Sequence, residues 1–384
     1  MCGEAVVSTA HPRLQMEVRE VPSGERRAAL IGEVRRGLCA TPKILPAQLL
    51  HDQHGDALWQ EIARQPEHYQ ARAEHALFTR IADEVIAEVR PTDLVDLGAG
   101  IDKTRLLLDA VRRHESWTRL LPVGTSESEL RRTSATLIDE YPWLEVQALA
   151  GDPGRDLEHL PRGGRRLVVM PGRSLASHTR SEAARMLARL ACVLDEGDQL
   201  LVGVDLVKPR RVLEAAGNDA AGKTAAWTKN LLEVLNRELD ACFDPELYRH
   251  RAVWNELRSR VELHLVAVRA HRVAIPGAGL TVRLAAGEAI RAAVSHKYRP
   301  LDMRRLFEIS GFRLSRLYAG GGVALALAER IPLGAVRDLD QNGPNSVNAP
   351  DALVLPFSSA APNLPIDAEK TERMVEYSPL AGEG

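Results

Sequence analysis

Features that this 384-residue sequence lacks exclude several classes of protein. Its four cysteines, Cys2, Cys39, Cys192 and Cys242, never form a C-x-x-C pair, so neither a zinc site nor a disulfide framework is expected. No run of about 18 apolar residues could cross a membrane, and the N-terminus lacks an export signal. The net charge of −2 gives no basis for binding nucleic acid or an anionic membrane. We therefore expect a cytoplasmic protein without a metal, a nucleic-acid partner or a membrane contact.

The middle of the chain alternates between apolar strands and amphipathic helices. The patterns predict strands at 93–97, 119–123, 145–148, 166–170 and 198–204, and helices at 103–114, 127–140, 181–194 and 223–239. Such alternation predicts an α/β fold with a mainly parallel, doubly wound sheet that helices cover on both faces. Antiparallel strands within 261–284, helices at 288–294 and 301–310, and closing strands within 312–329 follow.

These patterns divide the chain into six regions. We expect a flexible N-terminus (1–24), a helical segment contributing to a substrate domain (25–90), a Rossmann-like core (91–209), a second α+β substrate domain (210–300), a return to the core (301–330) and an extended tail (331–384). The tail is rich in Pro, Asn, Ser and Asp and has one apolar island, LVLPF (353–357). It is therefore predicted to be an arm that docks on a small protein partner.

A glycine turn lies between the first predicted strand of the core and its helix. Residues 94–112 read LVDLGAGIDKTRLLLDAVR, in which an apolar run ends at Gly98-Ala99-Gly100 and a helical pattern begins. Glycine lets a backbone adopt positive φ or approach a ligand closely. The arrangement is typical of nucleotide-binding α/β proteins, although a tight turn that binds nothing has the same pattern.

Seven segments together resemble the histidine-specific S-adenosylmethionine-dependent N-methyltransferases of ergothioneine biosynthesis, over about residues 26 to 330. The resemblance implies a class I methyltransferase-like fold with an inserted substrate domain. The matching segments are GLCATPKILP (37–46), QPEHYQARAEHALF (65–78), LVDLGAGIDKTRLLLDA (94–110), GRRLVVMPGRSL (164–175), LLVGVDLVK (200–208), NLLEVLNREL (230–239) and AVSHKYRP (293–300).

The sequence departs from this family at the residues expected to hold the cofactor. Its loop G-A-G-I-D-K-T is one residue shorter than the family's G-S-G-T-S-E-K-T, and Gly124-Thr125-Ser126 stands where the family has D-V-D. The carboxylate that would accept hydrogen bonds from both ribose hydroxyls is missing. Its loss should weaken the binding free energy of the cofactor by about 1.5–3 kcal/mol. We therefore expect no cofactor, with Gly98, Gly100 and Asp152 as remnants of its site.

The substrate positions differ as well. Family members hold the amino acid with tyrosines, an asparagine after the fourth strand and a Glu-x-Ser motif. The matching positions in this sequence are His51, His68, Gly217, Ser177 and Ala293, and only Ser295 is retained. Because the framework around these positions still matches, the changes indicate a different ligand.

Chemically capable residues fall at the ends of strands and in the matching segments. Asp205, Glu74 and His68 are the candidates for taking a proton from an amine, because a carboxylate or imidazole can act as a general base. The candidates for binding substrate or an anion are Arg72, Arg173, Ser174, Tyr69, Ser295 and Lys297. Three of these residues could instead have no part in a site. Asp205 could cap a neighbouring helix or pair with an arginine, and His68 and Arg173 could be exposed surface residues.

These observations favour a non-methylating relative of the family that acts on an amino-acid-derived amine in bacterial specialised metabolism. One such chemistry is aziridine closure, in which an amine attacks internally and sulfate leaves, as in azinomycin-type pathways. The enzyme would then be a lyase or cyclase whose amine substrate is sulfated, with a carrier-bound form left open. Two alternatives are a working S-adenosylmethionine-dependent N-methyltransferase and a non-catalytic subunit of a partner enzyme.

Overall fold

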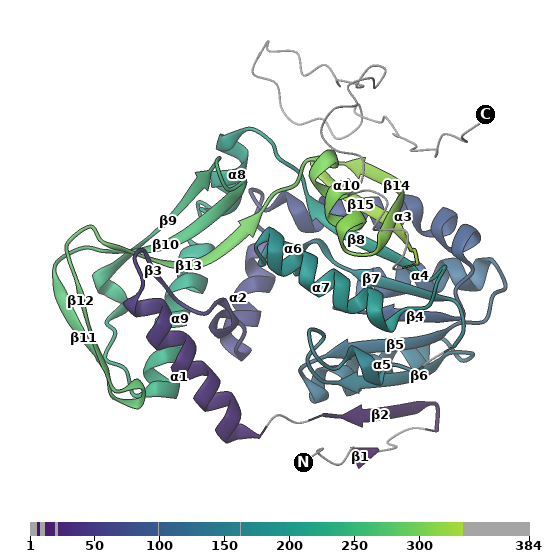
Figure 1. Ribbon diagram of the computed structural model, residues 1–384, viewed down its shortest axis with the longest axis horizontal. Helices are drawn as coiled ribbons and strands as arrows, with labels where there is room; N and C mark the ends of the chain where they lie inside the picture. The colour runs from purple at the N-terminus through teal and green to yellow at the C-terminus, as the bar shows by residue number, and fades with distance from the viewer. Residues whose placement is uncertain (1–5, 8–11, 20–21, 99, 162, 333–384) are drawn as a thin grey trace, which may run out of the picture.

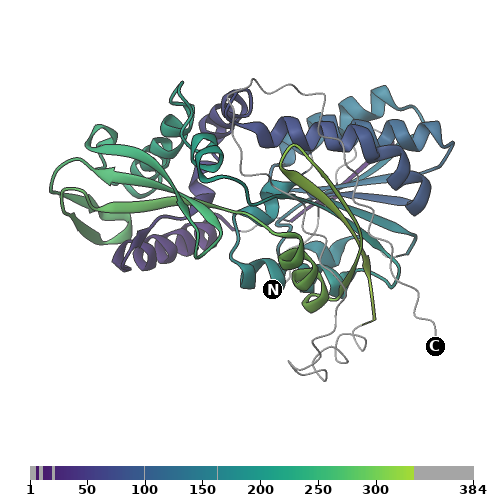
Figure 2. The ribbon, with the colours of Figure 1, turned by 90° about the horizontal axis from the view of Figure 1, so that it is seen from above.

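The computed structural model describes residues 6–7, 12–19, 22–98, 100–161 and 163–332 (Figure 1). The predicted docking arm and its LVLPF island lie outside these residues. Within them, two lobes lie side by side, and the chain passes between the lobes more than once (Figures 1 and 2).

The larger lobe is built on a nine-stranded sheet in the order β1-β2-β6-β5-β4-β7-β8-β15-β14. The six strands from β2 to β8 in this order are parallel, whereas β15 is antiparallel to both β8 and β14. This confirms the predicted doubly wound α/β sheet. The strands are β1 Val6–Val7, β2 Leu14–Val18, β4 Asp93–Asp96, β5 Arg119–Gly124, β6 Glu145–Ala150, β7 Arg166–Met170, β8 Gln199–Asp205, β14 Phe312–Gly320 and β15 Val323–Arg330.

Alternating strand residues build a separate core on each face of this sheet. Leu94 packs beneath the helices α3, α4 and α5, and its neighbour Val95 packs beneath α7 and α10. The elements of these layers are α3 Tyr69–Val89, α4 Ile101–Arg113, α5 Glu127–Glu140, η2 Leu157–His159, α6 Gly172–Ala176, α7 Arg180–Val193 and α10 Pro300–Ile309. Helix α3 thus covers the large sheet, although we expected residues 25–90 to serve the substrate domain.

The smaller lobe combines segments that come before β4 and after β8 in the sequence. A four-stranded sheet, β3-β13-β10-β9, and a β11-β12 hairpin share one core with the helices α1, α2 and α9. Its elements are α1 Ser23–Cys39, β3 Lys43–Ile44, η1 Ala47–Leu50, α2 Gln53–Ala63, α8 Arg210–Ala216, α9 Lys223–Leu239, η3 Pro245–Leu247, β9 Tyr248–Asn255, β10 Arg260–Ala267, β11 His271–Ile275, η4 Pro276–Ala278, β12 Leu280–Leu284 and β13 Ala289–His296.

Two predicted segments have a different structure. The alanine-rich stretch 288–294 was predicted to be helical, but it forms β13, which pairs with β10 and with β3. Residues 14–18, expected to be flexible, form β2 in register with β6, and Leu14 and Met16 are buried there. In both cases strand pairing and burial outweigh the local sequence preference.

Within the described part of the chain, no helix is both long enough and apolar enough to cross a membrane. The same residues contain no group of three or more His, Cys, Asp or Glu side chains arranged to hold a metal ion.

Candidate functional site: a glycine turn and a pocket between the lobes

The glycine turn lies where the strand order of the large sheet reverses. From β4 the chain continues outward through β5 and β6 on one side, and through β7 and β8 on the other. Ligands of doubly wound sheets bind beyond the carboxyl ends of the strands at such a switch point. Gly98 and Gly100 have φ of +88° and +86°, and a Cβ at either position would meet open space. The turn is therefore an open cradle of backbone.

Glu74 braces this turn from helix α3. One of its carboxylate oxygens accepts the backbone N–H of Gly172 at 2.7 Å, and the other accepts from Lys103 Nζ at 2.5 Å. Lys103 lies in the first turn of α4, so the carboxylate joins α3, α4 and the segment after β7. Glu74 was predicted to be a candidate base, but both of its oxygens are engaged in this brace.

The ends of the next two strands differ in the polar groups that they offer. At the end of β6, Asp152 is exposed and accepts the backbone N–H of Gly154 at 2.7 Å. At the end of β5, Gly124 has no side chain, and a Cβ there would make ordinary contact with Leu130 at 3.7 Å. An adenosyl cofactor bound at this edge would meet the open turn and the Asp152 carboxylate, whereas no carboxylate stands at Gly124 for its ribose.

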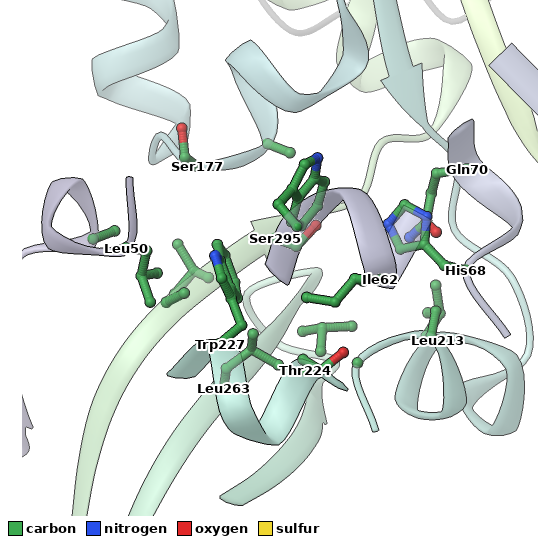
Figure 3. A pocket seen from close by; sticks show the side chains of 18 of the residues that line it. Leu50, Ile62, His68, Gln70, Ser177, Leu213, Thr224, Trp227, Leu263 and Ser295 are labelled. Carbon is green, nitrogen blue, oxygen red and sulfur yellow. The ribbon is translucent and has the colours of Figure 1, made fainter. Parts of the chain in front are cut away.

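A pocket lies between the lobes, and its cavity volume is about 120 Å³ (Figure 3). Helix α6, which contributes one wall, begins directly after β7, so the pocket adjoins the sheet edge that carries the glycine turn. Apolar side chains form most of the lining. The lining residues are Ala47, Leu50, His51, Trp59, Ile62, His68, Gln70, Ala176, Ser177, Leu213, Ala216, Gly217, Thr224, Trp227, Val261, Leu263, Ala293, Val294, Ser295 and Lys297.

Four aromatic rings form a continuous wall of this pocket. Trp59 contacts Trp227 with ring centres 5.2 Å apart, and each tryptophan also contacts a histidine ring. His68 lies edge-on to Trp59 at 5.3 Å, and His51 lies edge-on to Trp227 at 6.1 Å. These rings come from α2, α9 and the segments that precede α2 and α3.

A buried charge network lies behind one end of the pocket. Asp205, at the end of β8, pairs with Lys297 at 2.6 Å and with Lys208, and it accepts from the Tyr69 hydroxyl at 2.8 Å. Lys297 Nζ also donates to Ser295 Oγ at 2.7 Å. Burial alone would raise the pKa of Asp205, but the charges of Lys297 and Lys208 outweigh it and hold that pKa below its usual range. Asp205 is therefore an ionised anchor.

His68 and Gln70 bring unpaired acceptor atoms to the same end. His68 Nδ1 and Gln70 Oε1 are buried, and neither has a hydrogen-bond partner among the described residues. Burial, together with the nearby charge of Lys297, lowers the pKa of His68 to about 4. The imidazole is therefore neutral near pH 7 and can share a hydrogen bond with a ligand, whereas so low a pKa makes it a weaker general base than the sequence predicted.

Arg72 and Ser174, which were predicted to bind substrate or an anion, are not among the described lining residues of this pocket. The Arg72 guanidinium donates to the backbone carbonyls of Gln65 and Pro66 at 2.8 and 2.7 Å, so it holds the turn before α3. Ser174 is in α6, and its carbonyl accepts from Ser177 and bonds to His178. Arg173 directly precedes Ser174 in the same helix, but its side chain lies outside the described residues.

The structure therefore brings His68, Ser295 and Lys297 to one pocket, with Tyr69 and Asp205 directly behind it. Sequence reasoning missed Gln70, Lys208 and the tryptophans. The i,i+3 spacing of Asp205 and Lys208 could have indicated their pairing. The approach of Trp59 to Trp227 depends on two helices far apart in the sequence and left no local signal.

A sequence model of the family described as histidine-specific, S-adenosylmethionine-dependent methyltransferases matches residues 30–328. The chain is 40% identical over 305 residues to the histidine N-alpha-methyltransferase of Mycolicibacterium smegmatis, an alignment that covers 79% of this chain and 95% of that relative. This chain belongs to that family. The corresponding protein of Mycobacterium tuberculosis is 38% identical with the same coverage. The 4-dimethylallyltryptophan N-methyltransferase of Penicillium roqueforti is 26% identical over 73% of this chain and 86% of its own length.

Membership of this family confirms the class I methyltransferase-like fold and corrects the predicted chemistry. The two relatives at 38–40% identity are named as methyltransferases. The prediction of a non-methylating lyase or cyclase that closes an aziridine and eliminates sulfate is therefore wrong. The predicted sulfated substrate depended on that chemistry. The same chemistry was the reason for expecting Arg72 and Arg173 to bind an anion, so that reason no longer holds.

Proposed function

We propose that this chain transfers a methyl group from S-adenosylmethionine to the amino nitrogen of an amino acid. One observation carries the proposal: 40% identity to a histidine N-alpha-methyltransferase extends over 95% of that relative. The pocket between the lobes supports it, because its lining begins at the sheet edge that carries the glycine turn.

Several residues of the chain would hold the cofactor. The open backbone at Gly98 and Gly100 suits close approach, and Asp152 offers an acceptor at the end of β6. The Glu74 brace keeps α3 and α4 in place around the turn. When bound, S-adenosylmethionine would supply the electrophilic methyl group. Without a carboxylate at Gly124, we expect weaker binding of its ribose than a bidentate acceptor would give.

The pocket also favours the neutral amine that methyl transfer requires. Lys297 and Lys208 share a single carboxylate, so this described cluster keeps an excess positive charge next to the pocket. Both that charge and removal from water lower the pKa of a bound ammonium group, which frees the nitrogen lone pair. The His68 imidazole, neutral at pH 7, adds no further positive charge there and can hold the amine through a hydrogen bond.

Mass spectrometry of amino acids incubated with the purified chain and S-adenosylmethionine tests this function. We expect a product that carries one added methyl group on nitrogen and that forms only when both the chain and the cofactor are present. Lack of transfer to any of the common α-amino acids, from a folded chain with bound cofactor, would contradict the proposal.

A further inference from the structure

We infer that the substrate carries an aromatic or similarly apolar side chain in place of an imidazole, and that this group lies against Trp59 and Trp227. The inference rests on the proposed function, because it names the class of amine that the same pocket accepts. The two halves of the pocket support it independently.

The end of the pocket near the charge network suits the amine. Gln70 Oε1, an acceptor, and His68 Nδ1, an acceptor when the ring proton is on Nε2, are buried without a partner in the described structure, and an amine N–H can donate to them. The nearby Lys297 and Ser295 Oγ, which already bond to each other at 2.7 Å, suit the carboxylate of an amino acid. The polar head of the substrate is therefore expected at this end.

The opposite part of the pocket suits an apolar group. Figure 3 shows Leu50, Trp227 and Leu263 on the side away from His68 and Gln70. The Trp59 and Trp227 rings contact each other with centres 5.2 Å apart and planes tilted by 49°, and they offer aromatic surface against which another ring packs favourably.

An imidazole has no charged partner in the described part of this half, where the unpaired polar atoms of the lining are the uncharged Thr224 Oγ1 and Trp227 Nε1. Among the described lining residues none is acidic, and the position that matches the acid of the family's Glu-x-Ser motif is Ala293. An imidazole brings two ring nitrogens that must regain their hydrogen bonds at these two atoms, whereas a phenyl ring brings none and an indole ring brings one. The difference predicts discrimination of about tenfold or more in favour of the aromatic ring.

Calorimetric titration of the full chain with L-phenylalanine, L-tryptophan and L-histidine, without cofactor, tests the inference. The three probes share the amino and carboxylate groups, so a difference in their affinity reports the side chain alone. We expect either aromatic amino acid to bind at least about tenfold more tightly than histidine. Equal or tighter binding of histidine, or no measurable binding of both aromatic amino acids, would overturn it.

Three variants test whether the preference for an aromatic side chain depends on the pocket. Ala293→Glu places an acid in the pocket and should reduce or reverse the preference, whereas Ala274→Glu, on an exposed position of β11, should leave it unchanged. Thermal melting checks that both variants are folded, and Ala293→Gln repeats the test without a new charge. An unchanged preference in folded Ala293→Glu and Ala293→Gln would also count against the inference. Binding without methyl transfer would contradict the proposed function and leave this inference standing.

Discussion

The glycine turn and the pocket are two parts of one site, but they are built differently. Backbone forms the turn: Gly98 and Gly100 leave open space, and Glu74 fixes its surroundings through a backbone N–H and a lysine. Side chains from both lobes form the pocket, whose charged end is locked around Asp205. A region made of backbone keeps its shape while its neighbours change, whereas a region made of side chains changes its ligand with each substitution.

The largest effect that tests this contrast comes from the locked end of the pocket. Asp205→Ala leaves Lys208 and Lys297 buried side by side without their shared carboxylate, and loss of one partner from a buried ion pair costs roughly 3–5 kcal/mol of unfolding free energy. Urea unfolding measures the loss. Asp83→Ala, which breaks an exposed pair with Arg113, is the control and should cost less than about 1 kcal/mol. Similar small losses in both variants would show that Asp205 is not an anchor.

A second prediction concerns the neutral His68 in the pocket wall. Its pKa is about 4 in the folded protein, whereas a histidine in the unfolded chain titrates near its ordinary value of 6.5. Between these values the unfolded state holds more protons, so stability falls as the pH drops from 6.5 to 4, by on the order of 3 kcal/mol for this group. Urea unfolding across this window should show a smaller fall in His68→Gln than in the wild type.

The exposed His54→Gln serves as the control for that measurement, because it replaces a histidine that is not buried. Some slope should persist in His68→Gln, because burial also lowers the pKa of His296 to about 4. An identical slope in wild type and His68→Gln would mean that His68 titrates as it does in the unfolded chain.

The smallest expected effect comes from a substitution on the glycine-turn side of the site, which leaves the pocket unchanged. Gly124→Asp restores a carboxylate at the end of β5, where a Cβ makes only ordinary contact with Leu130. A charge-assisted hydrogen bond of about 1.5 kcal/mol or more should tighten S-adenosylmethionine binding by about tenfold. Calorimetric titration measures this change, with Thr125→Asp as a control that moves the same charge by one residue. Equal affinity in the wild type and Gly124→Asp would show that the ribose does not reach this strand end.

The same contrast explains how much of the molecule could be predicted from its sequence. Strand 166–170 and helix 223–239 have the predicted bounds, because apolar periodicity and turn residues are local signals. The alanine-rich 288–294 stretch gave a helical signal, and only its pairing with β10 and β3 makes it a strand. His68 and Lys297 could be placed at the site through the family segments, but the partners that neutralise and lock them depend on the folded structure.

Single substitutions at family site positions indicate the chemistry of this chain less reliably than its overall similarity to relatives does. Gly124 and Ala293 differ from the family pattern, and these differences suggested that methyl transfer had been lost. The overall similarity to named methyltransferases contradicts that conclusion. A missing carboxylate removes one favourable contact, which changes affinity, whereas the turn that would receive the methyl donor keeps its open backbone.

Transfer of a labelled methyl group in a competition assay tests the central claim most directly. The purified chain is incubated with methyl-labelled S-adenosylmethionine and equal amounts of L-phenylalanine, L-tryptophan and L-histidine, and the label on each amine is counted. We predict label on the amino nitrogen of an aromatic amino acid, in excess over histidine, with the signal reduced in Trp59→Ala. Label on none of the three amines, from a folded chain that binds the cofactor, would contradict the account.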